Sequence, residues 1–380
     1  MGQLEVVGMK VPYNYLPEQF ADPETFFSLW EPLIRSGEFT LGPYVEAFEQ
    51  KFADFVGSRH CISTNNGTDA LILGLKALGI GAGDEVITAT NSFYASAGAI
   101  AAVGADPVFA DVDDRYQIDL ASIEQVMSDR VRAIMPVHWA GASPEMAGIV
   151  AFADTHDLAV IEDACMGIGG SVDGRHPGTF GAIGAFSMHP LKTVNVMGDG
   201  GMVVTDDDDL AGWMRKYRNH GMTDRDHIEM WGVNMRLQPL QAVVASRLLD
   251  DLPDVVTQRN CNASLLDSEL GLLAPHVVVP PRLDGAIETF SLYIIRVEMR
   301  DELMAALHRG GVEAKIHYPI PLHLQAAAQP YNRRQVSLPR AELQSKSIIT
   351  LPVHQYLSVA QLQHAIKHVT EFFAHSGKVV

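Results

Sequence analysis

The central part of the chain alternates short apolar segments, rich in β-branched residues, with segments of helical periodicity. We expect strands at 60–64, 85–90, 107–112, 131–137 and 158–163. We expect helices between them at 68–78, 95–103, 119–127 and 144–156. Nearly continuous apolar strands separated by helices are typical of a mostly parallel sheet covered by helices on both faces. The pattern therefore predicts an α/β fold, in which ligands bind at the carboxyl ends of the strands.

The pattern changes after residue 180. Two strands are expected at 182–188 and 201–205 with no helix between them, so a hairpin-like excursion should carry the residues in between. A helix at 240–252 precedes a new unit, with a strand at 290–299, a helix at 301–309 and a strand at 312–318. This predicts a large domain at 1–250 and a smaller C-terminal α/β domain at 251–380.

Composition excludes several classes of protein. Apolar residues make up 47% of the 380 residues, which rules out global disorder. The formal charge of −18 would repel nucleic acid and anionic membranes. Three scattered cysteines give no disulfide framework or zinc site, and no histidine spacing suggests a metal. The longest small-apolar run, 95–105, is too short to span a membrane, and no secretory signal is evident. We therefore expect a cytoplasmic protein that binds small molecules.

The first segment with chemical potential is residues 64–69. A predicted strand ends there, Gly67 allows a turn, and Thr68 and Asp69 open a predicted helix. Free backbone N–H groups and the helix dipole make such a helix start a phosphate site, with the Thr68 hydroxyl as an additional donor. The alternative is ordinary helix capping by Thr68 and Asp69.

The second segment is the end of the strand at 158–163. Asp163 lies at its carboxyl end, where a partly desolvated carboxylate needs a positive partner. A protonated ring nitrogen of a cofactor would be one such partner. The alternatives are that Asp163 caps the next helix or pairs with a nearby arginine.

The third segment runs from Phe186 to Gly201. Lys192 is a lone lysine in an apolar stretch, and glycines follow it at 198, 200 and 201. Desolvation lowers the pKa of a lysine and makes it a nucleophile toward carbonyl groups. The alternative is a surface lysine in a loop.

Together, these three segments resemble the pyridoxal-phosphate-dependent enzymes of fold type I, and within them the DegT/StrS-type sugar aminotransferases. The resemblance runs through segments at 37–57, 65–87, 104–113, 133–141, 160–165, 186–192, 198–201, 218–221, 232–245 and 317–325. It implies a large domain with a mostly parallel, seven-stranded type of sheet flanked by helices, and a smaller C-terminal α/β domain. It also implies transfer of an amino group from glutamate or glutamine to a ketosugar or ketocyclitol, with pyridoxamine 5'-phosphate as an intermediate.

The resemblance also implies a role for each matching residue. Lys192 would form the Schiff base with the cofactor aldehyde, and Asp163 would pair with the pyridine nitrogen. Further cofactor contacts would come from Gly67, Thr68 and Ser187 on the phosphate, Phe93 on the ring, and Asn234 reaching the phosphate of a second subunit. Asn234 therefore implies a homodimer with composite sites. The candidates for contacts with the keto acceptor are His317, Tyr318 and His323.

One position departs from the family pattern. Three residues after the aspartate the family usually has glutamine, which contacts the phenolic oxygen of the cofactor, whereas this chain has Met166. A thioether is a poor acceptor and no donor, so Met166 would not tune the Schiff-base proton as the usual glutamine does. Two other branches of the family are a dehydratase branch, in which histidine replaces the lysine, and a regulatory branch. Lys192 argues against the first, and the Asp163–Lys192 pair argues against the second.

Overall fold

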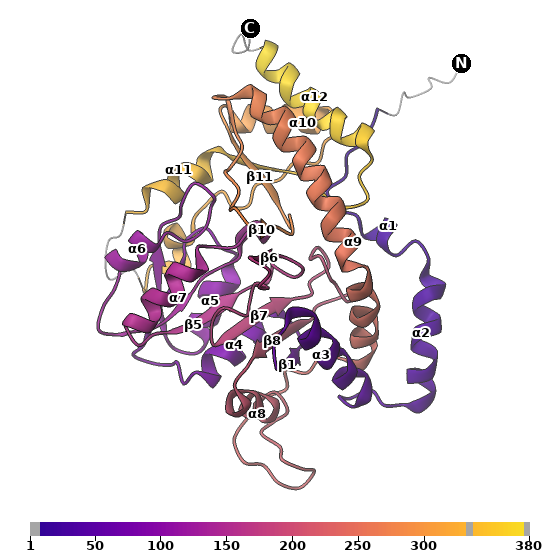
Figure 1. Cartoon of the computed structure of the whole chain (residues 1–380), viewed down its shortest axis with the longest axis vertical. Helices are drawn as coiled ribbons and strands as arrows, with labels where there is room; N and C mark the ends of the chain where they lie inside the picture. The colour runs from indigo at the N-terminus through magenta and orange to yellow at the C-terminus, as the bar shows by residue number, and fades with distance from the viewer. Residues whose placement is uncertain (1–7, 332–336, 376–380) are drawn as a thin grey trace.

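The computed structural model of the chain describes residues 8–331 and 337–375. Within these residues, a larger α/β part and a smaller one are joined by a single long helix, α9 (Pro239–Leu270), which runs along both (Figure 1). The first and last described residues both lie at the smaller part, at the top of Figure 1. No helix in the described part of the chain is both long enough and apolar enough to cross a membrane.

The larger part is organised around a seven-stranded sheet. In spatial order its strands are β1 (His60–Thr64), β8 (Gly201–Thr205), β7 (Ile183–Ser187), β5 (Ala159–Asp163), β4 (Val131–Met135), β2 (Glu85–Ala89) and β3 (Asp106–Ala110). Only β8 runs antiparallel to its neighbours β1 and β7, while the remaining pairs are parallel. The predicted α/β fold with a mostly parallel sheet is therefore confirmed.

Helices connect and cover these strands. Those of the N-terminal and larger part are α1 (Leu16–Gln19), α2 (Pro23–Ser36), α3 (Pro43–Val56), α4 (Gly67–Ala77), α5 (Tyr94–Ala102), α6 (Leu120–Gln125), η1 (Trp139–Gly141), α7 (Met146–Thr155) and α8 (Asp208–Tyr217). A short strand β6 (Ser171–Val172) pairs with β10 (Ala286–Ile287) and links this part to the smaller one.

Both faces of the large sheet are buried. Val203 of β8 packs in a cluster with residues of α4 and α8, whereas its neighbours Met202 and Val204 pack in another cluster with residues of α3 and α9. Every residue of β2, β7 and β8 is buried. Burial on both faces explains why these strands are continuously apolar in the sequence instead of alternating.

A buried carboxylate fixes the chain at the edge of β5. Glu162 is fully buried, and its side chain accepts hydrogen bonds of 2.7 Å from the backbone N–H groups of Gly178 and Gly181. It also bonds to Nε2 of His138 at 2.8 Å, and the His138 backbone N–H donates to the Asp163 carbonyl at 3.0 Å. Glu162 therefore holds the 178–181 turn and the end of β4 in place beside Asp163.

Helix α9 is longer than the sequence pattern predicts, because it continues from Leu252 through Pro253 to Leu270. A proline removes one backbone N–H donor and normally marks a helix end. Here the buried stripe continues on both sides of the proline, with Leu249 and Leu252 packed in the larger part and Leu266 and Leu270 in the smaller part. The predicted domain boundary near residue 250 lies inside this helix and stays a prediction.

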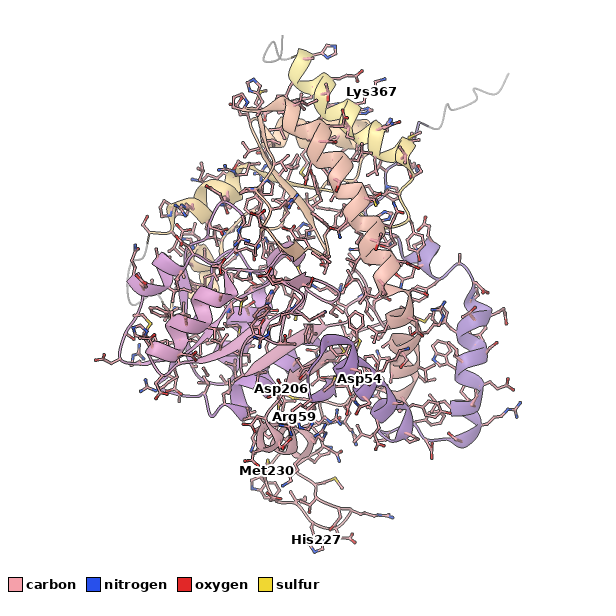
Figure 2. All side chains as sticks on the ribbon, in the orientation of Figure 1. Asp54, Arg59, Asp206, His227, Met230 and Lys367 are labelled. Carbon is pink, nitrogen blue, oxygen red and sulfur yellow. The ribbon has the colours of Figure 1, made fainter. Side chains whose placement is uncertain are left out.

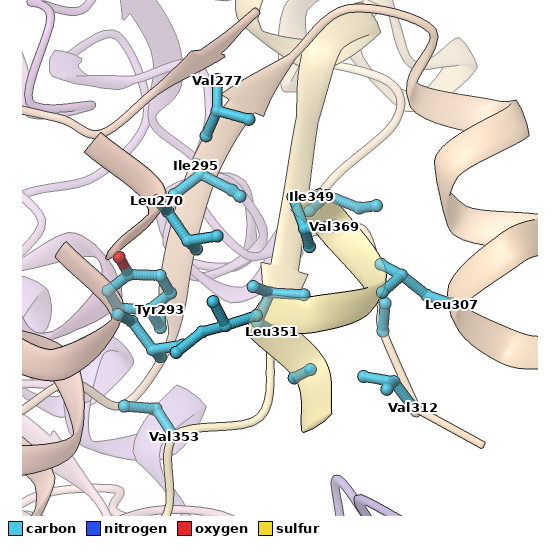
Figure 3. Packing of buried hydrophobic residues seen from close by; sticks show 14 of the residues in the cluster. Leu270, Val277, Tyr293, Ile295, Leu307, Val312, Ile349, Leu351, Val353 and Val369 are labelled. Atoms are coloured by element: carbon cyan, nitrogen blue, oxygen red, sulfur yellow. The ribbon is translucent and has the colours of Figure 1, made fainter. Parts of the chain in front are cut away.

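The smaller part contains an antiparallel three-stranded sheet with helices around it. Its elements, besides the C-terminal half of α9, are η2 (Gly271–Leu273), β9 (Val277–Val278), β11 (Tyr293–Val297), α10 (Arg300–Arg309), η3 (Leu322–Leu324), η4 (Ala326–Ala328), α11 (Pro339–Ser347), β12 (Ile348–Leu351) and α12 (Val359–His375). Its core, formed by residues such as Ile295, Ile349 and Val369, is shown in Figure 3. This confirms the expected smaller C-terminal α/β unit.

The strand predicted at 312–318 does not form. Val312 pairs only with Val11, and Lys315 pairs only with Thr350, each through an isolated bridge. The segment therefore changes partner within three residues, and its last two residues, His317 and Tyr318, turn into a cavity of the larger part. Alternation of polar and apolar residues predicted a strand, but it reflects burial against two different neighbours.

The packing of the 178–181 turn on the sheet gives a stability prediction. A Cβ on Gly184 of β7 would clash with the carbonyl oxygen of Gly178, so Gly184→Ala must push the turn away from Glu162. We expect the free energy of unfolding to fall by about 1–3 kcal/mol, measured by chemical denaturation. Gly212→Ala is the control, since nothing lies within 4 Å of a Cβ there. That helix position should gain about 0.5–1 kcal/mol, and equal stability of the two variants would contradict the prediction.

Candidate active site

The start of α4 meets the end of β7 at the carboxyl edge of the sheet. Asn66 caps the helix, because its side-chain oxygen accepts the backbone N–H of Asp69 at 2.8 Å. The alternative interpretation, in which Thr68 and Asp69 cap the helix, therefore does not hold. A Cβ on Gly67 would lie 2.7 Å from Cβ of Ser187, so only glycine allows this close approach. The first amides of a helix have no partner within it, and those of Gly67 and Thr68 open beside Ser187.

Asp163 ends β5 and is 5% exposed. One carboxylate oxygen accepts the Ser96 hydroxyl at 2.7 Å, and the other accepts the Cys165 backbone N–H at 3.3 Å. No helix begins directly after Asp163, so it is not a helix cap. Among the described residues, no lysine, arginine or histidine forms an ion pair with it. The carboxylate is thus oriented and buried, with its positive partner still to be supplied.

Lys192 lies in the excursion between β7 and β8. Its backbone N–H donates to the His189 carbonyl at 2.8 Å, and its own carbonyl accepts the Tyr15 hydroxyl at 2.9 Å. Burial lowers the pKa of the Lys192 amine, while the neighbouring Cys165 and Asp163 oppose that change. The side chain faces a cavity and is not a surface lysine.

These groups converge on one cavity of about 620 Å³. The predicted site residues that line it are Gly67, Thr68, Phe93, Asp163, Met166, Ser187, Lys192, His317 and Tyr318. They come from the ends of β1, β5 and β7, from the start of α5 and from the smaller part. Residues separated by up to 251 positions in the sequence, Gly67 and Tyr318, therefore face a common space.

Two predicted residues lie elsewhere. Asn234 is exposed on the loop after α8, where its side-chain oxygen accepts the Arg236 guanidinium at 3.0 Å. His323 is buried outside the cavity lining. Its ring bonds to the Thr90 hydroxyl at 2.6 Å and to Glu342 at 3.3 Å, and so links β2 to α11. The geometry gives His323 a structural position, and its predicted contact with the acceptor finds no support in this placement.

Several lining residues were not predicted, above all Trp139 and Tyr13. Tyr318 lies between aromatic rings, with centroid distances of 5.6 Å to Trp139, 5.5 Å to Tyr94 and 6.0 Å to Phe93. Trp139 follows the end of β4, a position that the rule about strand ends could have identified. Tyr13 has no such signal, because it reaches the cavity from the N-terminal segment and packs on His317 at 5.9 Å.

The two ring side chains that the smaller part contributes to the cavity, His317 and Tyr318, are uncharged at neutral pH. The pKa of His317 is lowered to about 4, mainly by burial and to a smaller extent by the nearby positive charges of Lys192 and Lys315. Burial raises the pKa of Tyr318 to about 12. At pH 7, His317 is therefore neutral and Tyr318 is protonated, so each can both donate and accept hydrogen bonds.

The residues present fit pyridoxal 5'-phosphate. The free N–H groups at the start of α4 suit its phosphate. The buried Asp163 carboxylate, which lacks a cation among the described residues, suits a protonated ring nitrogen. Lys192, with its lowered pKa, suits an aldehyde. Each of these three chemical requirements is met at the same cavity.

Fold and site together define an aminotransferase of fold type I. A model of the DegT/DnrJ/EryC1/StrS aminotransferase family matches residues 22–370, and the chain belongs to this family. The predicted family, fold and enzyme class are confirmed.

Similar proteins carry two kinds of name. The chain is 38% identical to a UDP-N-acetyl-3-dehydro-alpha-D-glucosamine 3-aminotransferase of Acidithiobacillus ferrooxidans, over 87% of this chain and 89% of that protein. It is also 38% identical to a "pleiotropic regulatory protein" of Geobacillus stearothermophilus, over 97% of this chain and 100% of that protein. Sequence similarity therefore connects it with both enzymatic and regulatory names.

Solved structures agree closely with this fold. S. venezuelae DesV, in complex with a ketimine intermediate, has a TM-score of 0.92 and 34% identity, covering 96% of this chain and 98% of that one. NtdA from Bacillus subtilis, with bound cofactor PMP, has a TM-score of 0.90 and 28% identity, covering 96% and 85%. Both similarities extend over almost the whole chain.

The lowered pKa of Lys192 gives a prediction about its reactivity. The amine should become deprotonated, and hence reactive, at lower pH than a free lysine side chain. Pulses of acetic anhydride over a pH series, with peptide mass spectrometry of the cofactor-free full-length chain, would measure the midpoint against N-α-acetyl-lysine in the same tube. Asp163→Asn removes a charge that opposes the shift, so its midpoint should fall further. A wild-type midpoint at or above the reference would contradict the prediction.

Proposed function

We propose that this aminotransferase uses pyridoxal 5'-phosphate to move an amino group from glutamate or glutamine to a ketone on a sugar, nucleotide-linked or phosphorylated, or on a cyclitol. Such a reaction serves amino-sugar, secondary-metabolite or surface-glycan synthesis, and we place it in the cytoplasm. One observation carries the proposal. The buried, oriented Asp163 carboxylate and the amine of Lys192, with its lowered pKa, face the same cavity.

Different residues would bind the phosphate, the ring nitrogen and the face of the cofactor ring. The phosphate would be held by the amides of Gly67 and Thr68 at the start of α4, where the helix dipole favours negative charge. Ser187, at the end of β7, would add its hydroxyl. Asp163 would hold the positive charge on the ring nitrogen, and Ser96 fixes the direction of its carboxylate. Phe93 would form a wall against the ring.

When bound, the cofactor supplies an aldehyde carbon for nitrogen and a ring that takes up the electrons left by a departing proton. Lys192 moves that proton. Burial keeps its amine neutral more readily than in water, so Nζ could take the α-proton of the amino donor and pass it to the carbon of the cofactor, and in the second half of the reaction it would carry a proton in the reverse direction, to the carbon of the keto acceptor. Asp163, by keeping a positive charge nearby, lowers the energy of the negative charge that develops.

The acceptor would bind against the aromatic side of the cavity. Neutral His317 and protonated Tyr318 offer hydrogen bonds to sugar hydroxyl groups without adding charge. Trp139 and the other rings around Tyr318 offer flat apolar surface to the face of a sugar or cyclitol ring. Met166 also lines this space, and its thioether replaces the amide that the family usually presents there.

A regulatory role is the second candidate, favoured by the name of the Geobacillus stearothermophilus relative. A cofactor-dependent sugar dehydratase is a third, which the presence of Lys192 disfavours. A regulator could bind the cofactor and still turn nothing over. Turnover of a ketosugar with glutamate or glutamine therefore separates the main proposal from both alternatives.

We further propose that the protein is a homodimer with composite sites. The loop after α8 that carries Asn234 also carries Trp231, which is 91% exposed, and it projects from the body near His227 and Met230 (Figure 2). Ile228 and Val233 of the same loop are also exposed, and several exposed apolar side chains on one loop are typical of an interaction surface. A second copy would cover it and bring Asn234 to the cofactor phosphate of that copy.

Lys192→Ala should lose both covalent cofactor attachment and transamination, because Lys192 is the one lysine among the described residues that line the cavity. Borohydride reduction of the protein with cofactor, followed by peptide mass spectrometry, should label Lys192 in the wild type and nothing in the variant. Lys315→Ala is the control, since Lys315 lies near the cavity with its amine 6.0 Å from the Tyr13 ring. A panel of ketosugars with mass-spectrometric product detection then measures turnover. Labelling of a different lysine would overturn the assignment, and labelling without turnover on any acceptor would favour the regulatory candidate.

Asp163→Asn should still bind the cofactor but lose turnover by on the order of 10²–10³-fold, because a neutral amide cannot hold the charge on the ring nitrogen. Steady-state rates with cofactor in excess measure the effect. Asp199→Asn removes a carboxylate that lines the same cavity but is exposed, and we expect a much smaller loss. Similar rates for the two variants would show that Asp163 has no special role.

Composite sites predict complementation between two inactive subunits. Mixing Lys192→Ala with Asn234→Ala should restore one intact site in each mixed dimer, or about a quarter of wild-type activity after random exchange of equal amounts. The assay is run at limiting cofactor, where the weaker phosphate contact of Asn234→Ala matters. Mixing Lys192→Ala with Asp163→Asn is the control and should restore nothing, because both residues belong to the same subunit's site. A monomer by light scattering, or no restoration, would contradict the proposal.

A further inference from the structure

The N-terminal strap, residues 10–19, lies outside the range that the family model matches, which begins at residue 22. Its first half is bound to the smaller part. The backbone of Val11 exchanges hydrogen bonds with Gly311 at 2.9 Å and Glu313 at 3.0 Å, and the Pro12 carbonyl accepts Nε2 of His354 at 3.0 Å. The strap is therefore a fixed part of the fold at this end.

The second half of the strap reaches the loop that carries Lys192. The Tyr15 hydroxyl donates to the carbonyl of Lys192 at 2.9 Å, across 177 positions of sequence. Four residues later, the side chain of Gln19 accepts a hydrogen bond of 3.1 Å from Asn195. The strap thus connects the smaller part to the lysine loop through side chains that the family match does not include.

The ring of Tyr15 is held firmly on the smaller-part side. Tyr15 is 3% exposed, its ring centroid lies 5.2 Å from that of His354, and the Arg259 guanidinium lies over the ring at 5.2 Å. Arg259 is itself held, because it donates to Gln355 at 2.9 Å and to the Phe290 carbonyl at 3.2 Å. The hydroxyl of Tyr15 therefore has little freedom to move away from Lys192.

The carbonyl of Lys192 depends on this hydroxyl. The excursion between β7 and β8 is not part of the sheet, and Tyr15 is the one donor to that carbonyl that the described residues provide. This hydrogen bond is partly buried, and a carbonyl that is shielded from water and has no donor is unfavourable, so loss of the hydroxyl would favour a loop conformation in which the carbonyl reaches water. Any such movement would displace the amine of the same residue.

We propose that Tyr15 is a positioning residue for Lys192: its ring is fixed by Arg259 and His354, and its hydroxyl fixes the lysine loop. The inference rests on the proposed role of Lys192 as the amine that bonds the cofactor. It adds to that role a part of the chain that the family match leaves out.

The test is Tyr15→Phe, which keeps the ring and removes only the hydroxyl. Tyr293→Phe is the matched control, because Tyr293 is also buried and its hydroxyl donates to Asp267 at 2.7 Å, away from the cavity. Amide hydrogen exchange of the full-length protein, with and without cofactor, should be about tenfold faster across 188–197 in Tyr15→Phe. That segment should be unchanged in Tyr293→Phe.

A second measurement separates positioning from mere packing. In the acetic anhydride series, the midpoint of Lys192 should move to higher pH in Tyr15→Phe, because water that reaches the amine reverses the effect of burial. It should not move in Tyr293→Phe. Unchanged exchange across 188–197 together with an unchanged midpoint would overturn the proposal. Both readouts can be made without cofactor, so they judge Tyr15 even if borohydride labels a different lysine and the proposed function fails.

Discussion

Burial of both faces of the large sheet is the constraint on which the site depends. With helices on either side, the strands carry mostly apolar side chains along their length, and most of the polar groups that face the cavity lie where the strands end. Because β1, β5 and β7 point the same way, the Asn66–Gly67 turn, Asp163 and Ser187 meet at one edge. The position of the cavity is therefore determined first by the direction of these strands, and only then by individual side chains.

Two adjacent carboxylates at that edge, Glu162 and Asp163, lie on opposite faces of β5 and have different roles. Successive side chains point to opposite sides, so Glu162 turns into the protein and Asp163 turns into the cavity. Glu162 uses both oxygens on buried donors of the chain itself. Asp163 accepts hydrogen bonds from the Ser96 hydroxyl and the Cys165 amide, and its carboxylate faces the cavity. The first carboxylate holds the backbone on which the second is aimed.

Sequence patterns predicted the parts of the fold that depend on local burial, and missed those that depend on distant partners. Continuous apolar runs located the strands of the large sheet, and segments at strand ends located Gly67, Asp163 and Lys192. The length of α9 was missed because Pro253 is a local stop signal, whereas packing on both sides of it is not visible locally. Tyr13 and Tyr15 could not be found, because their partners lie at least 177 positions away. His323 carries a residue type suited to chemistry, but Thr90 and Glu342 engage its ring.

Helix α9 has a mechanical consequence for the whole molecule. One half of this 32-residue helix belongs to the core beneath the large sheet and the other half to the core of the smaller part. A continuous rod leaves no flexible linker about which one body could swing over the other. Pro253, which lacks a backbone N–H, makes one turn of that rod softer than the rest. Opening and closing of the cavity would therefore take the form of elastic bending, with small amplitude and a restoring force.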